Sequence, residues 1–100
     1  MIPPLPYADQ RAYLDHNWPV YLDLLHQMVA INSFTFNPAG VNRLGALTAE
    51  RFAALGFTAE AVPADSFRYG HHLVLERPGR SGVDGRPAPV VGLISHLDTV

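Results

Sequence analysis

One histidine and one aspartate near the end of the chain stand at a spacing that suits metal chemistry. His96 and Asp98 lie two residues apart, with Leu97 between them. In extended backbone, side chains two residues apart point to the same side, so we expect this pair to share one face while Leu97 turns back toward the core. A neutral histidine binds zinc through one ring nitrogen, and a carboxylate that accepts the other ring N–H fixes its tautomer and orientation. The spacing therefore indicates a zinc-ligand histidine with an orienting carboxylate, although a His-x-Asp triplet also serves purely structural roles.

The run directly before this pair predicts the strand that would position it. Val90-Val91-Gly92-Leu93-Ile94 is continuously apolar, which is typical of a strand covered on both faces, so we expect it to be the best core segment of the chain. Ligand sites in α/β sheets collect beyond the carboxyl ends of strands, because loops there present side chains from a rigid base. His96 and Asp98 should therefore lie at the rim of a buried strand.

The first predicted element upstream is a helical region over residues 9–31. Apolar residues recur there at three- and four-residue steps and form one stripe. Pro19 interrupts this pattern and leaves two alternatives. Either one helix bends at Pro19, or Asn17 caps a second short helix in which Pro19 lies in the first turn.

The remaining segments complete an α/β pattern. Turn-forming Ser, Asn, Pro and Gly residues predict a loop over residues 32–42, and a second helix should follow over residues 42–55, with Gly56 as its stop. The expected inner side of this helix carries Leu44, Leu47, Phe52 and Leu55. Short strands are predicted at 57–62 and 71–77, and an exposed loop at 78–89. Helices followed by strands indicate a layered α/β domain.

The end of the chain resembles a known metal motif. Leu93-Ile94-Ser95-His96-Leu97-Asp98-Thr99-Val100 is similar to the first metal motif of the di-zinc metallopeptidase family that includes glutamate carboxypeptidase, acetylornithine deacetylase, succinyl-diaminopimelate desuccinylase and the aminoacylases. Upstream, Ile31-Asn32-Ser33, Asn37-Pro38-Ala39-Gly40-Val41-Asn42 and Ala54-Leu55-Gly56-Phe57 follow the order of that family's opening helix, loop, helix and strand. The resemblance covers most of residues 20–100. It implies the N-terminal portion of a layered α/β/α zinc-peptidase catalytic domain, with two or three helices followed by strands of a mixed sheet.

The resemblance also implies roles for individual residues. The family residue that matches His96 binds one zinc ion, and the residue that matches Asp98 supports that histidine and counts as catalytic. The complete protein would hold two Zn²⁺ ions, which Co²⁺ or Mn²⁺ could replace, and would hydrolyse an amide bond in a small peptide or an N-acyl amino acid. A bridging aspartate, a glutamate general base, further carboxylate ligands and a second histidine would follow position 100. Homodimerisation, where family members show it, uses a separate domain that these residues do not contain.

Residues 1–100 are accordingly expected to be the N-terminal part of a catalytic domain, truncated after the first metal motif. A catalytic zinc takes about three protein ligands and keeps one position for water. One histidine with a supporting aspartate cannot hold the metal tightly, so we expect the chain to be inactive alone. The alternative is a non-catalytic binding or structural module that keeps the fold.

Composition argues against several classes of partner. The net charge is -2, and the seven basic residues, all arginines, form no cluster that could follow a phosphate backbone, so no nucleic-acid partner is expected. Without cysteine, the chain can form neither a disulfide nor a thiolate metal site. The N-terminus lacks the basic and apolar stretches of a secretory signal, and no segment approaches the ~18 apolar residues of a membrane span. We therefore expect a cytoplasmic protein without a membrane partner.

Other candidate motifs fail on spacing. His71 and His72 are neighbours on a predicted strand and would point to opposite faces, so they should not chelate one ion together. The glycine spacing of residues 40–45 is that of a phosphate-binding loop, but Ala46-Leu47 stand where Lys and Ser/Thr are required. Ser95 lacks the flanking glycines of a nucleophile elbow.

Overall fold

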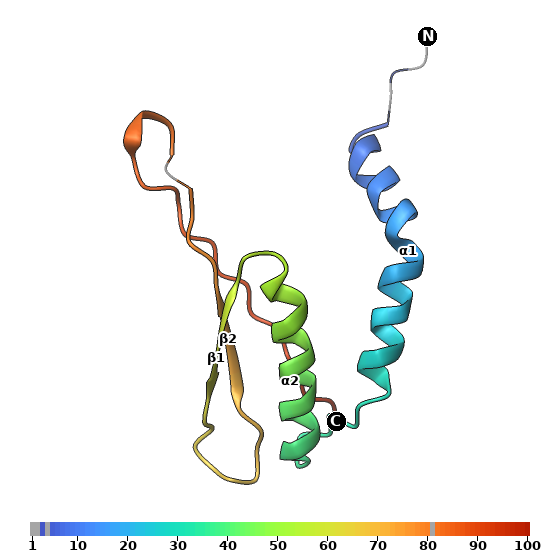
Figure 1. Cartoon of the computed structure of the whole chain (residues 1–100), viewed down its shortest axis with the longest axis vertical. Coiled ribbons are helices and arrows are strands. Elements are labelled where there is room, and N and C mark those ends of the chain that lie inside the picture. Colours follow the sequence, from blue (N-terminus) through green and yellow to red (C-terminus); the bar gives the residue numbers. More distant parts are fainter. Residues whose placement is uncertain (1–2, 4, 81) are drawn as a thin grey trace. The chain divides into compact units, whose positions relative to one another are not determined.

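The described residues form two α-helices, one short 3-10 helix and a two-stranded sheet (Figure 1). A computed structural model describes residues 3, 5–80 and 82–100. In chain order the elements are α1 (Ala8–Val29), α2 (Pro38–Ala53), β1 (Thr58–Val62), β2 (His72–Glu76) and a short 3-10 helix, η1 (Val83–Gly85). The chain divides into two compact units, Met1–Ala30 and Ile31–Val100. The mixture of helix and strand confirms the predicted α/β class.

The first unit consists mainly of α1, a continuous helix of 22 residues that runs through Pro19. Proline lacks the N–H that would bond to the preceding turn, yet the helix does not divide there. The alternative of two helices is therefore wrong. Asn17 lies inside α1, where its side-chain Nδ2 donates to the Tyr13 carbonyl at 2.8 Å instead of capping a helix. Within the described part of the chain, no helix, α1 included, combines the length and hydropathy needed to cross a membrane.

The start of α2 is fixed by Asn37 and Pro38. The Asn37 side chain accepts from the Gly40 N–H at 3.4 Å, and Pro38 occupies the first turn, where its missing N–H costs nothing. The helix therefore begins at Pro38. The predicted start near residue 42 is wrong. The same Asn, Pro and Gly residues that indicated a loop are the ones that begin the helix.

The end of α2 confirms Gly56 as the predicted stop. Gly56 adopts a φ of 88°, in the left-handed region that favours glycine. Its N–H donates to the Ala53 carbonyl at 3.0 Å, and the Phe57 N–H donates to the Phe52 carbonyl at 3.2 Å. This is the Schellman pattern, and the hydrophobic contact that accompanies it is present, since the Phe52 and Phe57 rings lie 5.2 Å apart, edge to face.

Both predicted short strands are confirmed, and they pair with each other. β1 and β2 are antiparallel, with a register that runs from Thr58 opposite Glu76 to Val62 opposite His72. The helix α2 contacts both strands along one side of the hairpin (Figure 1). The second unit is thus one helix against one hairpin.

The core of this unit is small and lies on the first half of α2. Val41 and Leu44 are each 5% exposed, and Gly40 and Gly45 are buried beside them. Of the predicted inner side, Leu44 is confirmed. Phe52 and Leu55 are 36% and 58% exposed, so their predicted inward position is wrong. The Schellman turn explains this for Phe52, which contacts Phe57 near the surface.

The prediction that residues 90–94 form a buried strand is also wrong. This apolar segment has no strand assignment, and Val90, Leu93 and Ile94 are 94–100% exposed. A strand that is covered on both faces lies inside a sheet, with strands paired along its edges and other elements packed over its faces. Among the described residues, β1 and β2 form the only sheet and pair with each other, so the apolar segment has no partner.

Candidate functional site

The candidate site forms where the end of the described chain meets the loop that precedes α2. Thr99 pairs with Phe34 in an isolated parallel bridge. The Thr99 N–H donates to the Ser33 carbonyl, and the Thr35 N–H donates to the Thr99 carbonyl, both at 2.9 Å. We call this pairing of residues 33–35 with Thr99 the seam. Ser33 is 5% exposed, so one side of the seam is anchored in the interior. These bonds fix the backbone directly beside Asp98.

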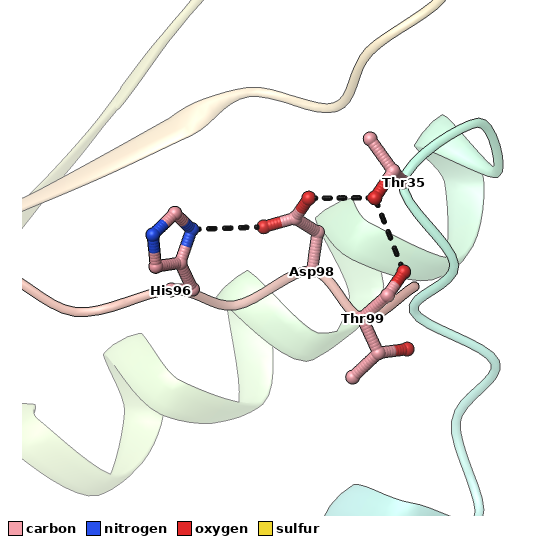
Figure 2. Close-up of polar contacts among 4 residues, drawn as sticks. All are labelled: Thr35, His96, Asp98 and Thr99. Atoms are coloured by element: carbon pink, nitrogen blue, oxygen red, sulfur yellow. Dashed lines mark hydrogen bonds and ion pairs between the residues drawn. The ribbon is translucent and has the colours of Figure 1, made fainter.

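His96 and Asp98 face each other, as the spacing predicted. Nδ1 of His96 lies 3.3 Å from Oδ1 of Asp98, while the second ring nitrogen points away from the carboxylate (Figure 2). Leu97 lies on the opposite side, with its Cδ1 3.7 Å from the position that a Cβ on Gly45 would occupy. The expectation of a shared face for His96 and Asp98, with Leu97 turned toward the core, is therefore confirmed.

Exposure differs sharply within the pair. The side chain of His96 is 88% exposed, whereas that of Asp98 is 34% exposed. Little protein surrounds the imidazole, so its orientation depends mainly on the carboxylate. Nε2 of His96 is open to solvent and could bind a cation.

Thr35 is a third member of the site, and no sequence motif predicts it. Its hydroxyl donates to Oδ2 of Asp98 at 2.7 Å and also lies 3.1 Å from the Thr99 carbonyl oxygen (Figure 2). The hydrogen bond from Thr35 holds the pKa of the Asp98 carboxyl below its ordinary value; partial burial opposes this effect, and the contact with His96 reinforces it. Thr35 and Asp98 are 63 residues apart in sequence, and no motif connects them.

Both carboxylate oxygens of Asp98 are engaged, which determines what the site can do. Oδ1 faces His96 and Oδ2 accepts from Thr35, so Asp98 is arranged to orient the imidazole and not to bind an ion directly. Throughout the described ranges, no three His, Cys, Asp or Glu side chains gather in a way that could hold a metal ion. The arrangement presents one imidazole nitrogen to a cation but does not enclose the cation.

An aromatic surface begins in the same loop. Phe36 contacts Phe34 and Tyr69, with ring centroids 5.7 and 5.5 Å apart. Phe36 also helps to line an open hollow with Pro38, Phe67 and Arg68. Neither His96 nor Asp98 borders that hollow, and Phe67 is 91% exposed, so the hollow is a shallow part of the surface.

The comparisons with known proteins do not extend this description: no protein-family model, no curated protein and no solved structure matches the chain. The observations that bear on function are therefore the site geometry and the motif that contains it.

Proposed function

We propose that this chain supplies a zinc-ligand histidine, His96, and its orienting carboxylate, Asp98, to a zinc-dependent amidohydrolase of the di-zinc metallopeptidase type. The supporting observation is the contact of 3.3 Å between Nδ1 of His96 and Oδ1 of Asp98, which leaves Nε2 open. A metal-bound imidazole needs one bare nitrogen for the ion and an acceptor for the N–H of the other. The pair meets both requirements.

The residues of this chain have separate tasks in the proposed reaction. The reaction is hydrolysis of an amide bond in a small peptide or an N-acyl amino acid, for which bound zinc would supply a Lewis acid and a water of lowered pKa. Asp98 accepts a hydrogen bond from the Nδ1–H of His96, so that Nε2 is the nitrogen with a free lone pair. The negative charge of Asp98 also makes the imidazole a more basic ligand.

The proposal requires further ligands from polypeptide outside these 100 residues. A catalytic zinc takes about three protein ligands, and no such group exists in the part of the chain that the structure describes. The family resemblance implies that these ligands would be further carboxylates and a second histidine for two Zn²⁺ ions, together with a glutamate that would transfer the proton to the leaving amine. The apolar segment 90–94 supports the same proposal, because a layered α/β/α domain with a mixed sheet would give it neighbours on both sides.

The direct test uses a longer polypeptide that contains these residues and is active on an N-acyl amino acid. His96→Ala should remove bound zinc and activity together, whereas Asp98→Ala should lower kcat and reduce zinc affinity by about 10- to 100-fold. Metal content is measured by elemental analysis and hydrolysis by release of the free amine. His72→Ala on β2 is the matched control, because His72 is also exposed but pairs with Val62 away from the site. Unchanged zinc content and unchanged activity in both site variants would contradict the proposal.

A second test uses the 100-residue chain itself. Added Zn²⁺ should bind weakly and shift the NMR signals of the His96 ring, because Nε2 is accessible while further ligands are lacking. The rings of His71 and His72 serve as internal references. Equal shifts at all three rings would indicate binding without a preference for the proposed ligand.

A further inference from the structure

We propose that Thr35 is a positioning residue for His96, acting through Asp98. Its hydroxyl holds Oδ2, so that Oδ1 is presented to Nδ1 of His96 and Nε2 is kept bare. The value of this arrangement for metal binding rests on the proposed function, but the arrangement itself is testable without any metal.

A carboxylate that is held by one contact alone is free to turn. The terminal torsion of an aspartate is broad, so contact with an exposed imidazole alone would leave the carboxylate free to turn. The side chain of His96 is 88% exposed, so too little protein holds it for it to fix the orientation of the carboxylate. The bond of 2.7 Å from Thr35 is the shorter of the two contacts and comes from the better anchored residue.

Thr35 is itself anchored by backbone hydrogen bonds. Its N–H donates to the Thr99 carbonyl at 2.9 Å, and Thr99 in turn bonds to Ser33, so backbone bonds hold both sides of the contact with Asp98 in register. The side chain of Asn32 accepts from the Phe34 N–H at 3.1 Å and fixes the preceding turn. Threonine is branched at Cβ, so its χ1 is restricted and its hydroxyl has a preferred direction.

The Thr35 hydroxyl has one proton and two possible acceptors. Oδ2 of Asp98 at 2.7 Å is closer than the Thr99 carbonyl at 3.1 Å and carries charge, so the proton goes to the carboxylate. Loss of the hydroxyl leaves the Thr99 carbonyl bonded to the Thr35 N–H. Replacing Thr35 by valine therefore removes the contact with Asp98 and keeps the backbone seam.

The experiment measures the tautomer of His96 in the 100-residue chain, with ¹⁵N-labelled histidine and long-range NMR correlation. In a neutral imidazole one ring nitrogen carries the proton and the other is an acceptor, so the two tautomers can be distinguished. The parent chain should show mainly the form with a proton on Nδ1, and the loss of its signals in His96→Gln identifies them. In Thr35→Val, the ratio of the Nδ1–H to the Nε2–H form should fall about threefold, as expected when one hydrogen bond of ordinary net strength is removed.

Two variants separate positioning from a general structural effect. Thr35→Ser keeps the hydroxyl and should restore the ratio of the parent chain. Thr48→Val is the matched control, because the Thr48 hydroxyl is also partly buried and donates at 2.8 Å, but to the Leu44 carbonyl within α2. It should leave the ratio unchanged.

The inference is overturned if Thr35→Val keeps the parent ratio while Asp98→Ala changes it, or if Thr48→Val changes it as much as Thr35→Val does. It is also overturned if the parent ring carries its proton mainly on Nε2. Failure of the proposed function has a different signature, since His96→Ala would then leave zinc content and activity unaltered whatever Thr35 does to the tautomer. If His96→Ala loses zinc but the tautomer ratio is the same in Thr35→Val and the parent chain, the proposed function is retained and the positioning role is rejected.

Discussion

Two segments of the second unit flank the site and differ in how they are held. The capped turn, residues 32–41, contains buried Ser33, Gly40 and Val41, and Asn37 ties it together by donating from Nδ2 to the Asn32 carbonyl at 2.9 Å. The apolar segment, residues 90–94, is almost fully exposed at Val90, Leu93 and Ile94. The more polar of the two is therefore the more buried. Short polar residues create their own partners locally, whereas an apolar run is buried only when another element covers it.

The largest expected difference between the two segments comes from adding one methyl group to a glycine. A Cβ on Gly40 would collide with the backbone carbonyl of Asn32 and lie 2.8 Å from Nδ2 of Asn37, whereas a Cβ on Gly92 would meet nothing within 4 Å. We expect Gly40→Ala to destabilise the second unit by about 3 kcal/mol or more, because backbone must move to make room. Gly92→Ala should change stability by no more than about 0.5 kcal/mol. Amide hydrogen exchange in α2 measures both, and equal effects would remove the contrast.

Truncation of a large aliphatic side chain should give the next largest effect. Leu44 is 5% exposed and Ile94 is 100% exposed. Leu44→Ala should cost about 2 to 3 kcal/mol, near the lower end of the usual range because the core is small and can partly collapse. Ile94→Ala is the matched control and should leave the denaturation midpoint unchanged. A clear loss of stability in Ile94→Ala would show that the apolar segment is covered in solution.

Removing the cap at Asn37 should have a smaller effect. Asn37→Ala loses the acceptor for the Gly40 N–H and the donor to the Asn32 carbonyl, and should cost about 1 kcal/mol. Asn37→Asp keeps the acceptor and loses the donor, so it should recover part of that loss. Chemical denaturation followed by helix content gives the order of the three proteins. A parent-like midpoint for Asn37→Ala would mean that Pro38 alone sets the start of α2.

The smallest expected effect is a dependence on pH at the seam. The pKa of the Asp98 carboxyl is lowered in the folded chain, mainly by the Thr35 hydrogen bond. As the pH falls below the ordinary pKa of this carboxyl, the unfolded chain therefore binds more protons than the folded chain. The stabilisation is therefore fully present above the ordinary pKa of 3.8 and is lost as pH falls through the lower folded value. Thr35→Val should weaken this loss, which denaturation midpoints between pH ~5 and ~3 would detect. Identical pH profiles for the parent chain and Thr35→Val would show that the hydrogen bond between Thr35 and Asp98 does not cause the loss of stability at acid pH.

The features that could be predicted from the sequence are those set by local geometry. The shared face of His96 and Asp98 follows from the alternation of an extended backbone, and the stop at Gly56 follows from the conformation that only glycine adopts easily. The two strands of the hairpin are short segments beside turn-forming residues, and β2 also contains Leu73, Val74 and Leu75.

The features that escaped prediction depend on a choice between local alternatives or on distant partners. Asn37-Pro38 can begin a helix as well as a turn, and Pro19 can lie within a helix. The local sequence alone therefore does not determine where these helices begin or end. The apolar segment 90–94 satisfied every local criterion for a strand but lacks a neighbour. Thr35 had no local signal at all, because its role arises only when the chain returns to it after 63 residues.

This return has a consequence for the order in which the molecule assembles. The contact from Thr35 to Thr99 closes a loop of 64 residues, whereas that from Thr58 to Glu76 in the hairpin closes one of 18. The entropy of loop closure makes the longer one more costly by about 1 kcal/mol. We therefore expect the hairpin to form first and the chemical groups to come together last, with the Thr99 amide exchanging faster than the paired amides of β1 and β2. A chain caught early in folding would have its scaffold before it had its site.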